Sequence, residues 1–146
     1  MLRSLSAVGR RVIPAPSLAH LAIVVRDLDA QTAVPAAALG LAVRERTTVP
    51  SEDVAVSFIP VGPAEIELIQ PLSGAGPLAR LLEGRGEGIH HLALRVPEIE
   101  AAIAKAAGAG LRLAGKAPRP GAHATRVAFV HPSSLHGLLL ELVESG

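Results

Sequence analysis

Two histidines of this chain begin two copies of one sequence motif. Residues 20–30 have the sequence HLAIVVRDLDA and residues 91–101 have the sequence HLALRVPEIEA, so nine of eleven aligned positions are identical or conservative. His20 and His91 therefore occupy equivalent positions in an internal repeat. An imidazole can bind a metal ion or transfer a proton. A single histidine in a strand is more often structural. Its recurrence at the same position of both copies favours a functional role instead.

Each half of the chain also ends in a strand-like run that carries a glutamate. Glu67 lies in AEIELI and Glu141 lies in LLLELV. Imidazole and carboxylate groups suit a first-row divalent ion, and two of each leave open positions in an octahedral shell. We therefore expect one divalent metal ion, acting as a Lewis acid, with four protein ligands: His20, Glu67, His91 and Glu141.

Neighbouring residues offer alternatives to two of these ligands. His90 is adjacent to His91, but the repeat and the strand alternation favour His91. Glu65 shares a strand face with Glu67, and only the match of Glu67 to Glu141 favours Glu67. Both neighbours remain alternative ligands on the sequence alone.

Three more histidines are weaker candidates for the site. His131 and His136 fall near the ends of expected strands, where we expect peripheral roles. His123 lies in the loop PRPGAH, and it either lines a pocket or occupies a turn.

The elements that must position these side chains follow from hydrophobic patterning. Each repeat begins with a strand (18–25 and 91–96), and a helix follows it (about 28–38 and 98–107). Three more strands complete each half, near 41–47, 53–60 and 64–70, and near 111–115, 125–131 and 137–143. Alternation puts the site histidines and glutamates on the face opposite the aliphatic residues of their strands. The sequence therefore predicts an α+β fold built from two paired βαβββ modules.

Local signals mark both ends of the first expected helix. Asp27 can cap the start of the first helix, and Gly40 can end it. Pro35 lies inside this helix, where a proline costs about 3 kcal/mol, so we expect a kink or an early end there. A short helical stretch is expected near 77–83.

We divide the chain into an N-terminal extension and one domain. Residues 1–17 contain arginines and serines but no acidic residue, a composition typical of a mitochondrial presequence or of a basic tail. Residues 18–146 form the domain, which consists of module one, a glycine-rich linker and module two at 18–71, 72–90 and 91–146.

Composition excludes several classes of protein. Hydrophobic residues make up 49% and charged residues 18% of the chain, which is too apolar for a disordered protein. No uncharged run approaches the roughly 20 residues of a membrane span. A net charge of +1 and the scarcity of aromatic residues give no nucleic-acid footprint. Because cysteine is absent, disulfides, zinc fingers, iron–sulfur clusters and thiol catalysis are excluded.

Several segments of the chain are specific enough to compare with known families. They are GEGIHHLAL at 86–94, PRPGAH at 118–123, IELIQPL at 66–72, the HP pair at 131–132 and GLLLELVE at 137–144. With these segments, the chain resembles the vicinal oxygen chelate superfamily and, within it, the methylmalonyl-CoA epimerase family. The family's metal ligands fall on the same four residues that the repeat selects.

The resemblance implies an enzyme that interconverts (R)- and (S)-methylmalonyl-CoA by proton transfer at the α-carbon through a metal-stabilised enolate. Glu141 is the first candidate for the catalytic base, and Glu67 is the second. Some relatives carry a further carboxylate in the third strand of the first half, where this chain has Val56. That base is therefore absent here or replaced by another residue.

The resemblance also implies a cofactor and partners. The expected cofactor is Co²⁺, with Mn²⁺, Ni²⁺ or Zn²⁺ as alternatives. We expect an acyl-CoA substrate and a homodimer, and neither nucleic acid nor a membrane as partner. The expected location is the mitochondrial matrix in a eukaryote and the cytoplasm otherwise.

Two other classes of function fit the same scaffold. One is another enzyme of the superfamily, such as a glyoxalase or a ring-cleaving Fe(II) dioxygenase, although such dioxygenases use two histidines and one carboxylate. The other is a non-catalytic protein that binds small molecules and generally lacks the four metal ligands. Metal content after purification in metal-free buffer discriminates catalysis from binding.

Overall fold

The computed structural model describes residues 16–44 and 46–145, so most of the expected N-terminal extension lies outside the described residues. The elements in chain order are β1 (Ser17–Val24), α1 (Leu28–Leu39), β2 (Thr47–Val49), β3 (Val54–Val61), β4 (Ala64–Pro71), α2 (Pro77–Arg85), β5 (Gly88–Arg95), α3 (Ile99–Gly108), β6 (Arg119–Pro120), β7 (Arg126–Val130) and β8 (Leu140–Glu144). The short helix expected near 77–83 is confirmed as α2. Among the described residues, no helix has the length and apolar character needed to span a membrane.

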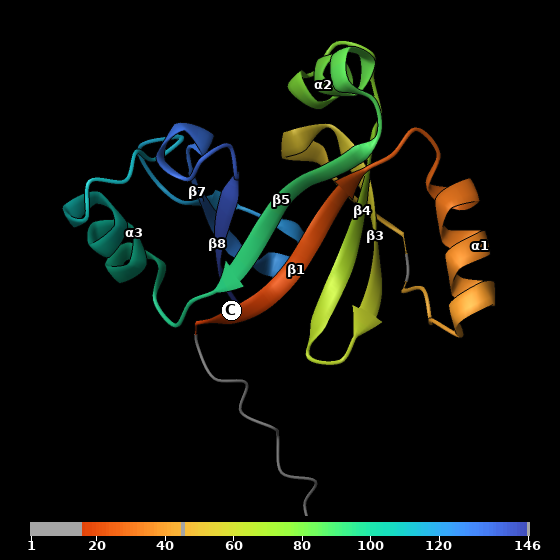
Figure 1. The fold of residues 1–146 in the computed structure, drawn as a ribbon, viewed down its shortest axis with the longest axis horizontal. Helices are drawn as coiled ribbons and strands as arrows, with labels where there is room; N and C mark the ends of the chain where they lie inside the picture. Colours follow the sequence, from red (N-terminus) through yellow and green to blue (C-terminus); the bar gives the residue numbers. More distant parts are fainter. Residues whose placement is uncertain (1–15, 45, 146) are drawn as a thin grey trace, which may run out of the picture.

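The strands form one eight-stranded mixed sheet in the order β2-β3-β4-β1-β5-β8-β7-β6. Its centre is the antiparallel pair β1 and β5. Each of these strands also pairs in parallel with the last strand of its own half, which is β4 or β8. The two halves therefore repeat one topology outward from the centre (Figure 1), and the predicted α+β fold of two paired βαβββ modules is confirmed.

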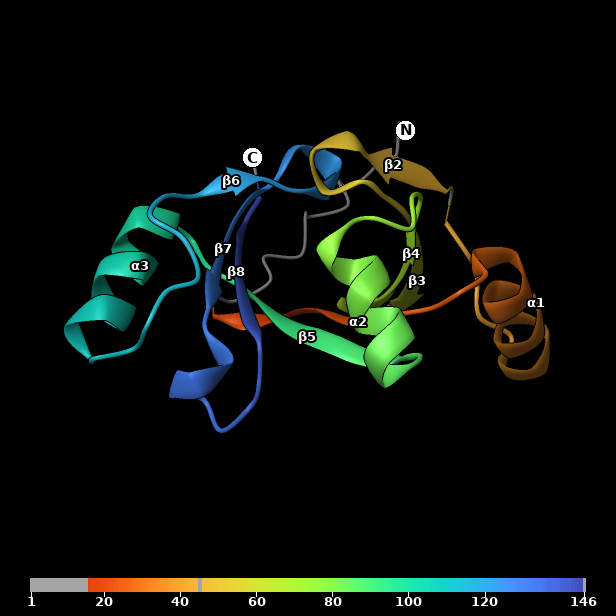
Figure 2. The same ribbon diagram turned by 90° about the horizontal axis from the view of Figure 1, so that it is seen from above.

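The sheet is strongly curled, so its two ends rise on either side of the central strands (Figure 2). Helix α1 lies outside the curl beside the first half and contacts β4. Helix α3 lies outside the curl beside the second half and contacts β7 and β8. Because both of these helices lie on the convex side, neither covers the concave face, where Leu78 of α2 packs against apolar residues of the first half.

Each outer helix is anchored to the last strand of its own half. The backbone N–H of Leu28, at the start of α1, donates to Gln70 Oε1 on β4 at 2.9 Å. The N–H of Ile99, at the start of α3, donates to Glu144 Oε2 on β8 at 2.5 Å. The strands that carry the two site glutamates thus also hold the helices in place.

The ends of α1 follow the predicted capping residues. Asp27 Oδ1 accepts hydrogen bonds from the backbone N–H groups of Asp29 and Ala30 at 2.9 and 3.1 Å. Gly40 ends the helix with a φ of 64°, a left-handed conformation that glycine adopts without steric cost. The helix runs past its proline to Leu39, so the expectation of an early end is wrong. Caps at both ends and packing against β4 stabilise its full length.

The edge strand of the first half begins later than expected. We predicted a strand near 41–47, but the structure has no strand at residues 41–44. Leu41 packs into the core beneath α1, and the Arg44 N–H donates to Phe58 O on β3 at 2.8 Å. Leu41 thus packs in the core and does not pair in the sheet, and β2 forms the edge strand of the first half.

The edge strand of the second half is also displaced along the chain. The strand expected near 111–115 is reduced to an isolated bridge between Leu113 and Val130. Gly115 has a φ of 139°, which turns the chain out of an extended strand. The edge is completed by β6, which follows in the PRPGAH segment.

Buried residues beneath the two outer helices match across the repeat. Leu28 and Ile99 are 1% and 0% exposed, and they are among the largest fully buried side chains. Leu28 packs on the convex faces of β3 and β4, and Ile99 packs on those of β7 and β8. Burying one such side chain contributes about 1.5–3 kcal/mol. The predicted apolar stripe of each half therefore lies under its helix.

Candidate metal centre

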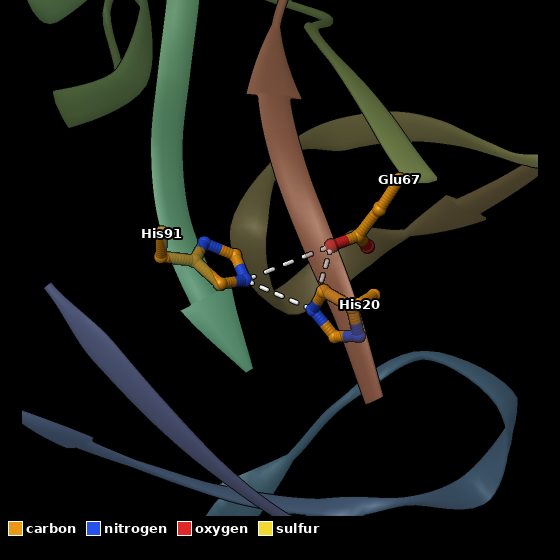
Figure 3. A group of neighbouring side chains, drawn as sticks. All are labelled: His20, Glu67 and His91. Carbon is orange, nitrogen blue, oxygen red and sulfur yellow. Dashed lines mark hydrogen bonds and ion pairs between the residues drawn. The ribbon is translucent and has the colours of Figure 1, made fainter. Parts of the chain in front are cut away.

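Side chains from neighbouring strands converge on the concave face of the sheet. His20 on β1 and His91 on β5 bring their Nε2 atoms to 3.0 Å. Glu67 on β4 places Oε2 3.1 Å from His20 Nε2 and 3.7 Å from His91 Nε2 (Figure 3). The candidate ligand atoms of these three residues all lie within 4.8 Å of one another, which is close enough to hold one metal ion.

Glu141 on β8 approaches the same histidines from the second half. Its Oε1 lies 3.5 Å from His20 Nε2, and its Oε2 lies 3.2 Å from His91 Nε2. The structure therefore brings together all four side chains that the repeat singles out. His91, Glu67 and Glu141 are 4%, 7% and 6% exposed. Buried polar groups of this kind require partners, and here they are one another's partners.

The strand register explains why these side chains meet. Ala22 on β1 is in register with His91 on β5 and with Glu67 on β4. Ala93 is the equivalent residue of the second repeat, and it is in register with His20 on β1 and with Glu141 on β8. Both alanines are 0% exposed. A larger side chain at either position would fill the space in which the imidazoles and carboxylates converge.

The only two aromatic side chains of the sequence flank this centre. Phe58 on β3 lies opposite Glu67, and Phe129 on β7 lies opposite Glu141. The ring of His91 meets Phe129 edge to face, with centroids 5.5 Å apart. Across the concave face the order is thus phenylalanine, glutamate, histidine, histidine, glutamate, phenylalanine. An approximate twofold axis passes between the histidines.

The carboxylates favour positive charge at the centre. Burial by itself would lower the pKa of His20, but the hydrogen bond with Glu67 and the negative charges of nearby carboxylates raise it above its usual value. A divalent cation would match the charge of two carboxylates and could take the place of the protons that the imidazoles otherwise bind.

His90 contacts the Nδ1 atom of His91, on the side of the ring away from the Nε2 atom that faces the centre. The two Nδ1 atoms lie 2.8 Å apart. Burial, together with His91 and Arg85, lowers the pKa of His90 to about 4, so His90 is neutral at neutral pH. Neutral His90 can accept a hydrogen bond from the Nδ1–H group of His91. That tautomer leaves the lone pair of His91 Nε2 facing the centre.

The donor set fits a divalent metal ion. Two donors about 2.1 Å from one ion and at right angles to each other lie roughly 3 Å apart. The Nε2 atoms of His20 and His91 are 3.0 Å apart. Imidazole nitrogen and carboxylate oxygen are accepted by cobalt, manganese, nickel and zinc.

The centre opens into a cavity of about 800 Å³ on the concave face. Val54, Val56 and Ile69 form an apolar wall in the first half. Residues 119–123 of the second half line the cavity as well. A cavity of this size that combines an apolar wall with a cluster of polar side chains is typical of sites for small molecules and cofactors.

Arg119 lies at the mouth of the cavity and is a residue that the sequence pattern did not single out. Its Nε lies 3.4 Å from Glu52 Oε1, which joins the two halves across the opening. Its guanidinium lies over Phe129, 5.0 Å from the ring centroid. The signal in the sequence was the segment PRPGAH, which contains this arginine.

The weaker candidates are placed differently from the four central residues. Glu65 pairs with Arg44 at 2.8 Å rather than with the histidines. His131 accepts a hydrogen bond from the Ser133 N–H at 3.1 Å and caps a short 3-10 turn. His136 is exposed. Neither His131 nor His136 is among the described residues that line the cavity.

Known proteins are similar to this chain in both sequence and fold. A family model described as the glyoxalase/bleomycin resistance protein/dioxygenase superfamily matches residues 19–129. An ethylmalonyl-CoA/methylmalonyl-CoA epimerase of Cereibacter sphaeroides is 39% identical over 127 residues, which cover 86% of this chain and 95% of that protein.

Solved structures agree with this similarity. The methylmalonyl-CoA epimerase of Mycobacterium tuberculosis matches with a TM-score of 0.85 and 30% identity over 94% of this chain and 95% of that one. A methylmalonyl-CoA epimerase in complex with methylmalonyl-CoA and NH4+ matches with a TM-score of 0.83 and 28% identity, over 88% and 94% of the two chains.

Proposed function

Because the chain belongs to the glyoxalase/bleomycin resistance protein/dioxygenase superfamily, we propose that it is a metal-dependent epimerase that interconverts (R)- and (S)-methylmalonyl-CoA. The observation that carries the proposal is the convergence of two histidines and two glutamates at the base of a cavity. The similarity to epimerases of methylmalonyl-CoA over most of the chain supports this choice of substrate.

The reaction removes a proton from the carbon between the thioester and the free carboxylate and returns one to the opposite face. A divalent ion held by His20, Glu67, His91 and Glu141 would supply a Lewis acid that stabilises negative charge on the substrate oxygens. The chain itself orients these donors, lines the cavity with apolar residues that exclude water, and moves the proton.

We place the base on one of the two central carboxylates. Glu141 and Glu67 lie on different sides of the histidine pair, and they are carried by β8 and β4. Glu141 is the first candidate and Glu67 is the second. In either case the carboxylate accepts the α-proton as the electrons of the C–H bond move toward the thioester carbonyl.

The proposal includes a cofactor, a partner and a location. The ion is Co²⁺, or otherwise Mn²⁺, Ni²⁺ or Zn²⁺. The partner is an acyl-CoA, whose anionic groups Arg119 could meet at the cavity mouth. We also propose that the chain forms a homodimer, and its mass in solution, measured by analytical ultracentrifugation, would test this. The location is the mitochondrial matrix in a eukaryote, where residues 1–17 would serve as a presequence, and the cytoplasm otherwise.

Solvent exchange tests the proposal. Protein treated with EDTA is incubated with methylmalonyl-CoA in D₂O, with and without added Co²⁺, and deuterium at the α-carbon is followed by NMR. We expect metal-dependent incorporation of deuterium together with scrambling of configuration. The absence of exchange with any of the four ions would reject this substrate.

The same experiment separates the alternative functions. His91→Ala protein with the same added ion is the control for exchange catalysed by free metal. An enzyme for another substrate would bind one ion per chain but leave the α-proton in place. A non-catalytic binding protein would need no ion at these residues, so its metal content would remain near zero after dialysis.

A further inference from the structure

His123 is an exposed residue that lines the cavity, on the side of the histidine pair opposite to Glu141. It belongs to a short 3-10 turn (Ala122–Ala124) in the second half of the chain, yet its ring packs on Phe58 of the first half. The ring centroids are 4.5 Å apart. Because Phe58 is in register with Glu67, the imidazole lies at the Glu67 end of the concave face.

His123 is also free of polar partners within the described part of the chain. Four acid–base side chains line the cavity there besides the proposed ligands. Three of them have a partner: Glu52 with Arg119, Glu65 with Arg44, and His90 with His91. Among residues 16–44 and 46–145, none forms a hydrogen bond or an ion pair with the His123 imidazole. Its ring nitrogens are therefore available to a ligand.

The loop that carries His123 is built to hold one conformation. His123 and Ala124 both have left-handed backbones, with φ of 54° and 56°. A Cβ on Gly121 would lie 2.6 Å from Thr125 Oγ1. The Thr125 N–H and Oγ–H groups both donate to Ala122 O, at 3.2 and 2.7 Å. Backbone strain of this kind persists where the surroundings enforce it, and it concentrates at functional sites.

An epimerase needs a proton-transfer group on each face of the α-carbon. One group removes the α-proton, and the other must be protonated so that it can donate a proton to the opposite face. Imidazole both accepts and donates a proton near neutral pH, whereas a carboxylate is mostly ionised there. Resting on the proposed function, we infer that His123 is the second proton-transfer residue and acts on the face of the substrate opposite to Glu141. Glu67 then serves the metal centre alone.

The proton balance of this step is complete. The Glu141 carboxylate takes the α-proton, and the electrons of the broken C–H bond move into the thioester carbonyl. The His123 imidazolium donates its proton to the opposite face as those electrons return to form the new C–H bond. Glu141 ends protonated and His123 ends neutral, and exchange with water restores both. The reverse direction uses the same groups in exchanged roles.

Two substitutions of His123 test the inference in D₂O with each epimer supplied separately. His123→Phe keeps an aromatic ring on Phe58 but cannot transfer a proton, and His123→Asn tolerates the left-handed backbone. His136→Asn is the matched control, because His136 has the same φ of 54° but lies outside the cavity. Bound metal is measured in every protein.

We expect both His123 variants to keep stoichiometric metal and to interconvert the epimers at least about 100-fold more slowly than wild type. They should still exchange the α-proton of one epimer with retention of configuration, because Glu141 still faces it. The His136→Asn control should match wild type.

Two results would overturn the inference without touching the proposed function. Interconversion at the wild-type rate in both variants would remove His123 from the reaction. An equal loss of α-proton exchange in both epimers would show that the effect of His123 is not specific to one face of the substrate. Failure of the wild-type protein to exchange with any of the four ions would instead reject the epimerase proposal and, with it, this role.

Discussion

The Nε2 atoms of His20 and His91 lie 3.0 Å apart, although 71 residues separate the two histidines in the chain. Two imidazole nitrogens at this distance can share one hydrogen, or each can offer a lone pair to one cation. The carboxylates of Glu67 and Glu141, which approach both nitrogens, favour the cation because they add negative charge.

Removal of either imidazole should therefore release the ion. We expect His20→Ala and His91→Ala to bind Co²⁺ at least about 100-fold more weakly than wild type. Loss of a residue that only hydrogen-bonds to a ligand already lowers metal affinity about 10- to 100-fold. Metal content after dialysis checks this. His136→Ala, at an exposed turn, should keep one ion per chain. Stoichiometric metal in His91→Ala would remove His91 from the ligand set.

The hydrogen bond behind His91 should influence metal affinity as well. His90→Ala removes the acceptor 2.8 Å from His91 Nδ1, so we expect affinity to fall about 10- to 100-fold. His90→Asn provides an amide oxygen that can accept the same hydrogen bond and should recover most of the loss. Competition with a chelator measures both variants. If both bind as wild type does, His90 does not orient His91.

Neutralising the first-choice base should separate chemistry from metal binding. Glu141→Gln keeps an oxygen donor of similar size but cannot accept the α-proton. We expect kcat to fall roughly 10²- to 10⁴-fold while metal remains bound. Turnover with both epimers, together with metal analysis, checks this. A rate near that of wild type would assign the base to another residue, with Glu67 the first to test.

Removal of the metal should lower the thermal stability of the protein. An ion that binds only the folded state stabilises it by about 2.7 kcal/mol at a hundredfold excess over Kd, which corresponds to roughly 5–10 °C in Tm for a domain of this size. Thermal scans with EDTA and with Co²⁺ measure the shift. His91→Ala is the control and should show no shift. An equal shift in that variant would mean that Co²⁺ stabilises the fold from another site.

A change at Gly121 should disturb the His123 loop while leaving the four ligands in place. The added Cβ would lie 2.6 Å from Thr125 Oγ1, so we expect Gly121→Ala to destabilise the fold by about 1–3 kcal/mol. Interconversion of the epimers should slow, and metal affinity should be unchanged. Gly74→Ala is the control, because nothing lies within 4 Å of its added Cβ. Denaturant unfolding that is identical in both variants would show that the loop relaxes at little cost.

Much of the fold could be predicted because it depends on local patterns. Strand alternation and the repeat identified the central strands and the two outer helices, and Asp27 and Gly40 marked the ends of α1. The edge strands could not be predicted in the same way. Leu41 lies in an alternating run typical of a strand, but its place in the core beneath α1 depends on β3 and β4, which come later in the chain.

The sequence by itself favoured the two histidines and two glutamates that meet, because equivalent positions in two copies of one unit become neighbours when the copies pair about an approximate twofold axis. It left His90 and Glu65 open as alternatives, and the structure places them beside His91 and Arg44 instead. The tertiary structure alone decided where the repeat is broken. His123 covers Phe58, whereas Arg119 covers Phe129, so one end of a symmetric row faces an imidazole and the other a guanidinium. No local pattern encodes this difference, because it arises when one loop of the second half crosses the cavity to the first.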